Sequence, residues 1–122
     1  MHRYIVMAAA WLEIVVGAIF IAVPDVPCVL VFGAKPEGMG VPLAHWVGVG
    51  LFALGIACLP SKPAGSSRSA VLGLLVFNGG VTVLLAWVGT VSAVHGFLLW
   101  PVTVLHAVIT AALLPQVLTA SK

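Results

Sequence analysis

The chain alternates between long apolar stretches and short segments rich in proline, glycine, serine and charge. A helix needs about 20 predominantly apolar residues to cross the hydrocarbon core of a bilayer. Four stretches approach or reach that length. The pattern therefore predicts an all-α membrane protein with a single integral membrane domain over residues 1–122, built as a bundle of four transmembrane helices at about residues 3–23, 42–59, 69–91 and 96–118.

The first connection between these helices is the longest. Pro24, Pro27 and Pro36 fall within it, and proline interrupts a helix because it lacks an N–H and its ring clashes with the preceding turn. We expect a proline-rich external loop. Its apolar part, residues 26–32, is too short to span a membrane and is expected to form a half-turn at the lipid headgroups.

The other two connections are short. Residues 60–69 have the proline, glycine and serine content of a linker. Residues 92–96 leave room only for a tight turn, so the last two helices should form an antiparallel hairpin. No internal repeat relates the two halves of the chain.

Composition excludes a soluble domain. The chain is 62% hydrophobic and 7% charged, whereas soluble domains have about 25% charged residues. The first apolar run is about 20 residues long and contains a carboxylate, whereas a signal-peptide core has roughly 7–15 apolar residues. We therefore expect this run to be retained as the first spanning helix.

Several kinds of site are not indicated. Cys28 and Cys58 lie in different segments, which fits neither a CxxC redox motif nor a zinc site, and the predicted topology separates them too far for a disulfide. The basic residues are scattered, which argues against a nucleic-acid partner. No phosphate-binding loop or catalytic triad is present, so the sequence indicates no cofactor and no metal, and it favours a role other than catalysis without deciding whether the protein is an enzyme.

The distribution of Lys and Arg predicts the orientation, because cytoplasmic segments carry an excess of both. An even number of crossings puts both termini on one side. That side would hold four of the five basic residues, Arg3, Lys62, Arg68 and Lys122. The first connection holds Lys35 together with two acidic residues. We predict a multi-pass protein of the inner membrane with both termini cytoplasmic.

Small residues should mark the helix interfaces, because packing within lipid depends on close approach of the backbones. Gly48 and Gly55 lie on one stripe of the second predicted helix, and we expect this stripe to pack against a neighbour. Further small residues that permit such an approach are Ala9 and Gly17 in the first helix, and Gly79 and Gly80 in the third.

Each predicted helix carries one polar residue that could bear chemistry. These residues are Glu13, His45, Asn78 and His106. At about 1.5 Å of rise per residue, all except His45 lie near one depth, whereas His45 lies close to the outer end of its helix. An ionised carboxylate at the centre of the bilayer costs at least about 2.5 kcal/mol. Glu13 should therefore face the bundle, be protonated or be paired.

We predict an intramembrane network of Glu13, His106 and Asn78 as the binding site. Thr103 and Thr110 flank His106 at i−3 and i+4 and extend the polar stripe. Three interpretations stay open. The groups could satisfy one another to fix helix register, they could form a proton-linked or substrate-binding site, or Glu13 could be tolerated by snorkelling in a thin bilayer.

His45 is a secondary candidate. Together with His106 it could ligate haem across the bundle. The two histidines differ in depth by about seven residues, or ~10 Å, which argues against a shared iron.

The segments PDVPCVLVFG, LAHWVGVGLFALGIACL, LLVFNGGVTVLLAW and FLLWPVTVLHAVITAALL together resemble the small bacterial four-helix membrane proteins, DoxX-like and related uncharacterised families. This resemblance covers most of the chain. It implies a bundle in the bacterial inner membrane without an agreed chemistry.

The chain is also similar to the small multidrug resistance transporters in its length, its helix count and a carboxylate in the first helix. This resemblance implies that Glu13 would be the essential carboxylate. The proline-rich first connection and the segments FNGGV and LLWPVTVLH depart from that family.

These observations lead to three functional hypotheses. The first is a structural, accessory or small-ligand-binding bundle, working in the lipid bilayer alone, as a homo-oligomer or with another membrane protein. The second is a proton-coupled transporter of lipophilic cations centred on Glu13. The third is a component of a membrane oxidoreductase that binds quinone or haem.

Overall fold

The computed structural model describes residues 2–59, 67–93 and 95–119, and over this range the chain contains helices and no strand. Lys62, Lys122 and most of the second predicted connection lie outside the described residues. The all-α fold is confirmed, and the ends of the four long helices differ from the predicted ones by at most three residues. The helices are α1 (His2–Ala22), α2 (Asp25–Phe32), α3 (Gly40–Cys58), α4 (Arg68–Val91) and α5 (Leu99–Thr119).

Four of these helices, α1, α3, α4 and α5, are long and apolar enough to cross a membrane. Their outward faces are also apolar. Trp46 is 79% exposed, and Val76 and Val83 are 72% and 70% exposed. Soluble proteins rarely expose contiguous apolar patches larger than a few hundred Å², so this surface favours lipid as its surroundings.

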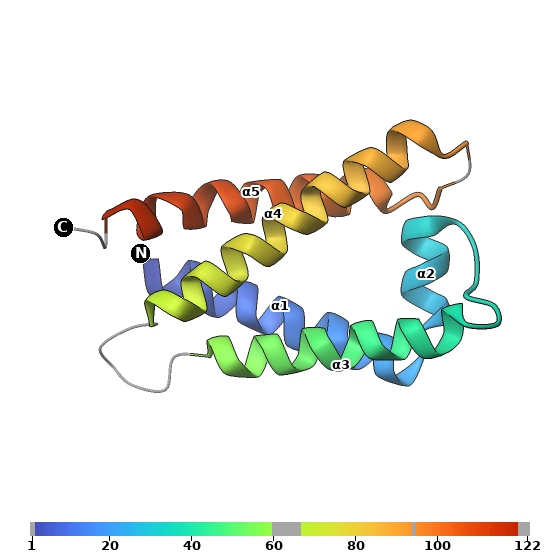
Figure 1. The fold of residues 1–122 in the computed structure, drawn as a ribbon, viewed down its shortest axis with the longest axis horizontal. Helices are drawn as coiled ribbons and strands as arrows, with labels where there is room; N and C mark the ends of the chain where they lie inside the picture. The colour runs from blue at the N-terminus through green and yellow to red at the C-terminus, as the bar shows by residue number, and fades with distance from the viewer. Residues whose placement is uncertain (1, 60–66, 94, 120–122) are drawn as a thin grey trace.

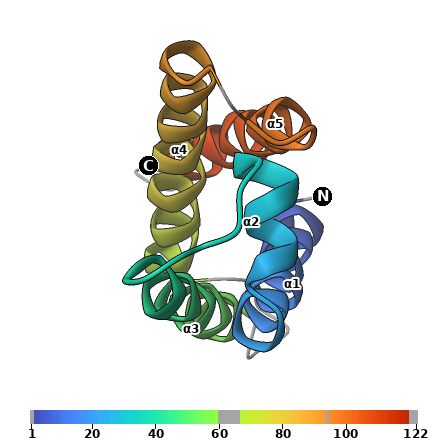
Figure 2. The same ribbon diagram turned by 90° about the vertical axis from the view of Figure 1, so that its right-hand side faces the viewer.

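The long helices are arranged as two antiparallel pairs (Figure 1). Helix α1 packs along α3, and α4 packs along α5, whereas the contacts between the two pairs are fewer. The view along the bundle shows one pair lying above the other (Figure 2). The residues between the pairs therefore decide what lies at the centre of the molecule.

Glycines allow α1 and α3 to approach closely, as predicted for Gly48 and Gly55. A Cβ atom added at Gly55 would lie 2.6 Å from the Ala10 carbonyl oxygen, and one added at Gly48 would lie 2.8 Å from the Ile21 nitrogen. From the other side, a Cβ at Gly17 would lie 2.5 Å from the Phe52 nitrogen. The two backbones thus touch where a side chain would otherwise hold them apart.

Gly79 and Gly80 do not lie at a close contact between helices, although such a contact was expected there. A Cβ at Gly79 would make only an ordinary contact with Thr110, and one at Gly80 would meet open space. The close approach in α4 occurs instead at Gly89, where a Cβ would lie 2.7 Å from the Leu99 side chain. The first residues of α5 therefore pack their side chains against α4 at Gly89.

An apolar core joins the two pairs at the end where α1 begins. All four long helices contribute to it, and most of its residues are small or medium-sized. Its buried members are Val6, Ala9, Ala10, Cys58, Val71, Leu74 and Leu113. The same end of the bundle holds the start of α1 and the end of α5 (Figure 1).

The prediction of a half-turn in the first connection is wrong, because residues 25–32 form the two-turn helix α2. Pro24 is its N-cap and Pro27 lies in its first turn. The first four N–H groups of a helix have no partner within it, so proline is tolerated there and helps to begin the helix. Gly33 ends α2 with a left-handed φ of 77°, a conformation in which glycine is the usual residue.

Helix α2 bridges the two pairs at the end opposite the apolar core (Figure 2). The Gly96 N–H donates to the Val31 carbonyl at 3.0 Å, and the Leu98 N–H donates to the Leu30 carbonyl at 2.8 Å. These bonds tie the connection before α5 to α2, and a turn in which the Leu99 N–H donates to the Gly96 carbonyl precedes the helix. Helix α5 consequently begins at Leu99, three residues later than predicted.

Candidate functional site

Glu13 lies near the middle of α1, eleven residues after the helix begins at His2. Its side chain is 1% exposed and faces the interior of the bundle. Among the buried side-chain nitrogen and oxygen atoms of the described residues, Glu13 Oε1 alone has no hydrogen-bond partner. Because buried polar groups are nearly always paired, this oxygen is the most unusual atom of the interior.

The side chains of Asn78 and His106 form a hydrogen bond with each other between α4 and α5. His106 Nδ1 lies 2.7 Å from Asn78 Oδ1, and Asn78 Nδ2 donates to the Leu74 carbonyl at 2.9 Å. The second bond fixes the amide, since the group facing a carbonyl must be the NH₂ donor. Oδ1 is then the acceptor, so His106 Nδ1 must carry the hydrogen.

The Phe77 ring supports the imidazole from the side. The ring centroids of Phe77 and His106 are 6.3 Å apart with an interplanar angle of 77°. An edge-to-face arrangement of this kind is favourable for aromatic rings. The orientation of His106 is therefore set both by Asn78 and by packing.

The Glu13 carboxyl interacts with the Asn78 side chain. Asn78 thus lies between the acid and the imidazole, and the structure brings all three predicted residues together. One NH₂ hydrogen of Asn78 is used by Leu74, which leaves one for the carboxyl. With that interaction made, Oε1 remains the acceptor without a donor. Whether the three residues bind anything stays a prediction at this point.

The threonines near the cluster are satisfied within their own helices. Thr103 donates to the Leu99 carbonyl at 2.7 Å, and Thr110 donates to the His106 carbonyl at 2.8 Å. Helical threonines commonly donate to the carbonyl of residue i−4. Their hydroxyl hydrogens are consequently not directed at Glu13 or at the imidazole.

His45 stands apart from the cluster. It lies five residues into α3, near the end that α2 bridges, and its side chain is partly buried. No hydrogen bond or ion pair joins it to the cluster in the part of the chain that the structure describes. Within that same part, no three His, Cys, Asp or Glu side chains gather as a set of metal ligands.

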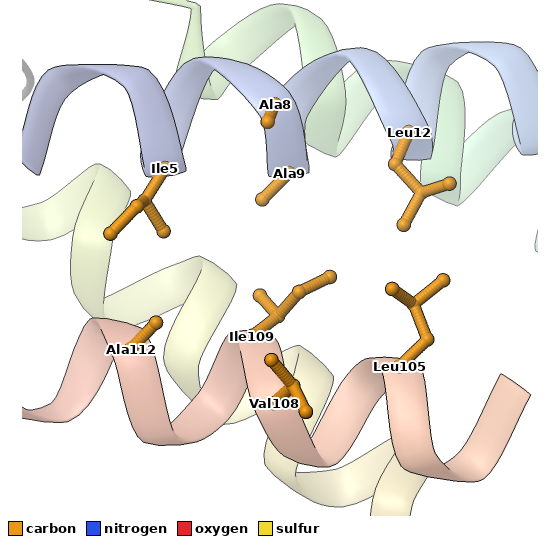
Figure 3. A pocket seen from close by; sticks show the side chains of 8 residues that line it. All are labelled: Ile5, Ala8, Ala9, Leu12, Leu105, Val108, Ile109 and Ala112. Atoms are coloured by element: carbon orange, nitrogen blue, oxygen red, sulfur yellow. The ribbon is translucent and has the colours of Figure 1, made fainter.

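An apolar groove between α1 and α5 was not predicted. It has a volume of about 380 Å³, and the eight residues lining it are alanine, leucine, isoleucine and valine (Figure 3). Ala8 and Ala9 on α1 and Ala112 on α5 provide the space. A search for adjacent small residues on two helices could have raised this site, but only once α1 and α5 were known to be neighbours.

The cluster can accept a hydrogen bond from an N–H or O–H group at a buried position. Its neighbours are apolar side chains and an amide–imidazole pair, and no cationic side chain interacts with the Glu13 carboxyl in the described residues. The described ion pair, Lys35 with Asp25 at 3.0 Å, lies at the end of the bundle where α2 is found.

Comparisons beyond the chain itself add no family to this description. No protein-family model matches the sequence, and no curated protein and no solved structure matches it either. The two family resemblances drawn from the sequence stay predictions, and the geometry of the cluster and of the groove carries the functional argument.

Proposed function

We propose that this chain is a multi-pass protein of the bacterial inner membrane that binds a small ligand at Glu13, Asn78 and His106. The observation that carries the proposal is the buried Glu13 oxygen without a hydrogen-bond partner. A ligand with an N–H or O–H group would supply the missing donor. The chain would then act by holding a small molecule in the membrane rather than by catalysis.

The energetics support a ligand. Leaving a buried polar group unsatisfied costs about 1–3 kcal/mol, and the hydrocarbon core of a membrane offers no water to relieve this cost. A residue that served only to fix helix register could have been an asparagine or a threonine, as in α4 and α5. A carboxyl group at this depth is therefore better explained by binding.

The arrangement of charges supports the proposed orientation. Helix α1 begins and α5 ends at one end of the bundle, where α4 begins at Arg68. Lys35 lies at the opposite end and is paired with Asp25. Cytoplasmic termini and an external first connection would satisfy the preference of Lys and Arg for the cytoplasm.

The test compares small molecules that co-purify with the wild type and with variants in a mild detergent. Glu13→Met removes the carboxyl and keeps a side chain of similar length. Glu37→Gln changes the other glutamate of the chain, which is exposed outside the helices. We expect mass spectrometry of solvent extracts to find a compound enriched with the wild type and Glu37→Gln, and lost from Glu13→Met. Equal extracts from all three would overturn the proposal and leave Glu13 with a structural role.

Proton-coupled transport of lipophilic cations is the second candidate, favoured by one observation. Glu13 is the sole acidic residue of the four long helices, since the other two acidic residues are Asp25 in α2 and Glu37 in a connection. A transporter would release protons when tetraphenylphosphonium is added to the purified protein. Glu13→Gln would abolish that release, because an amide does not titrate. Absence of release from the wild type would dismiss this candidate.

A further inference from the structure

The buried side chains of α1 end at Glu13. Before it, Val6, Ala9 and Ala10 are at most 2% exposed, and Glu13 itself is 1% exposed. Within residues 14–22, Gly17 alone is buried, and it has no side chain and faces α3. Glu13 therefore stands at the limit of the interior that α1 shares with the α4–α5 pair.

On one side of Glu13, apolar packing closes the bundle. Leu74 and Leu113 are fully buried and Val6 is 1% exposed, and all three belong to the apolar core to which the four long helices contribute. Leu74 lies one turn from Asn78, toward the start of α4. Because protein interiors are close-packed, a path to Glu13 from this end would have to displace the core.

On the other side of Glu13, the two pairs separate. Figure 1 shows the start of α4 beside the end of α3, whereas the end of α4 is well separated from the start of α3. Figure 2 shows α2 lying across this end, between α1 and α5. Helix α2 therefore joins the pairs where the long helices themselves have moved apart.

The joint consists of backbone hydrogen bonds. The carbonyls of Leu30 and Val31 accept from the N–H groups of Leu98 and Gly96. Both carbonyls belong to the last turn of α2, in which a helix has no internal partners for its carbonyls. We call α2 together with residues 96–98 the bridge.

The bridge should open more readily than the apolar core. Cys28 is the one buried side chain of α2, whereas the core holds seven buried residues. A backbone hydrogen bond contributes little net stability, and elements with few buried apolar contacts open locally before the rest of a fold. An opening motion would therefore begin at the α2 end and pivot at the core.

We propose that α2 is a releasable bridge that controls access to Glu13. When its hydrogen bonds to residues 96–98 break, the two pairs part at this end and a water-filled path reaches the carboxyl. Glu13 moves with α3, whereas Asn78 and His106 stay together on the other pair. As the entry route of a ligand, the path rests on the proposed function; the release of the bridge does not.

The experiment measures how fast a charged methanethiosulfonate modifies Glu13→Cys in lipid nanodiscs. The reagent needs a water path, because ions are excluded from hydrocarbon. Peptide mass spectrometry reads position 13 separately from the two native cysteines. Adding Gly96→Ala, whose Cβ would run into the Leu30 carbonyl, should speed modification about tenfold, as two weakened backbone hydrogen bonds predict. Adding Gly40→Ala, whose Cβ makes only an ordinary contact, should not change the rate.

The native cysteines show whether the opening is confined to one end. Cys28 lies in the bridge and Cys58 in the apolar core, and both are buried. In Gly96→Ala, modification of Cys28 should rise and that of Cys58 should stay low. An unchanged rate at position 13 would overturn the proposal. An equal rise at Cys58 would also overturn it, because the whole bundle would then have loosened.

A second measurement keeps residue 13 natural, so it decides the matter even if Glu13→Cys does not fold. Spin labels at the exposed positions Val41 and Val91 report on the α2 ends of α3 and α4, and labels at Ile56 and Leu72 report on the core ends. Release of the bridge should lengthen the first distance and leave the second unchanged. Two unchanged distances would contradict the opening.

The outcomes separate this proposal from the ligand site. A co-purifying compound that depends on Glu13, together with access that ignores the bridge, would overturn the bridge and keep the ligand. Access that depends on the bridge, without any co-purifying compound, would keep the bridge and overturn the ligand. Failure of both measurements would overturn both.

Discussion

The two faces of α1 are packed in opposite ways. Toward α3, glycines let the two backbones touch, and an added Cβ would fall within 3 Å of backbone atoms. Toward α5, small side chains leave a groove of about 380 Å³. Small residues thus serve both to bring helices together and to keep space open, and the neighbouring helix decides which occurs.

This difference assigns separate tasks to the two faces. The α1–α3 face fixes the position of Glu13, because a backbone in close contact cannot shift without a clash. The α1–α5 face, by contrast, leaves an open apolar groove. A rigid face beside an open one is what a binding site in a small bundle requires.

The most damaging change should be at the close contact. Gly55→Ala puts a Cβ atom 2.6 Å from the Ala10 carbonyl oxygen, and we expect a loss of about 1–3 kcal/mol in the free energy of unfolding, as for other overpacked sites. Gly50→Ala is the control, because a Cβ there meets open space on the same helix. Thermal unfolding in detergent measures both. Equal stability of the two variants would show that α1 and α3 are not in close contact.

The bridge from α2 to the α4–α5 connection should be the next most sensitive feature. A Cβ atom at Gly96 would run into the Leu30 carbonyl, which accepts the Leu98 N–H. Gly96→Ala should therefore detach the connection from α2 and speed hydrogen exchange at Leu98. Gly40→Ala is the control, because a Cβ atom there would meet only the Pro36 side chain, at an ordinary contact distance of 3.5 Å. Unchanged exchange at Leu98 in Gly96→Ala would count against the bridge.

A smaller loss is expected inside the cluster. Asn78→Leu removes the acceptor of the His106 N–H and the partner of Glu13. Hydrogen bonds between membrane helices contribute about 0.6 kcal/mol on average and 1.7 at most, so two lost partners should lower stability by about 1–2 kcal/mol. Thr82→Val is the control, because its hydroxyl bonds only within α4. The ¹⁵N shifts of His106 should change in Asn78→Leu alone.

Periodicity and length were enough to predict the long helices, since lipid imposes a length on each of them. The packing stripe of Gly48 and Gly55 could also be predicted from the sequence, because both residues fall on one side of a single helix. Helix α2 is not predicted by the sequence pattern because Pro24 and Pro27 favour an interruption of helix, although proline in a first turn is compatible with a helix.

The groove could not be predicted from the sequence, for a physical reason. Ala8 and Ala112 create space only because they face each other across two helices that are not consecutive in the chain. Likewise, the matched depths of Glu13 and His106 predicted that they lie at one level. They did not predict that Asn78 would stand between them, since depth leaves the rotation of each helix undetermined.

The smallest effect on stability, and the most telling one for function, should come from Glu13→Gln. The amide keeps a hydrogen-bonding group beside Asn78, so the free energy of unfolding should change by about 0.5 kcal/mol. Glu37→Gln, at the exposed glutamate, should change it even less. A structural Glu13 would therefore be replaced without consequence. A site that accepts a hydrogen bond from a ligand should keep that ligand in Glu13→Gln and lose it in Glu13→Met, whereas a proton-coupled site should fail in both. Thermal unfolding and ligand retention of these three variants, measured side by side, distinguish a ligand site at Glu13 from a bundle that only tolerates a buried acid.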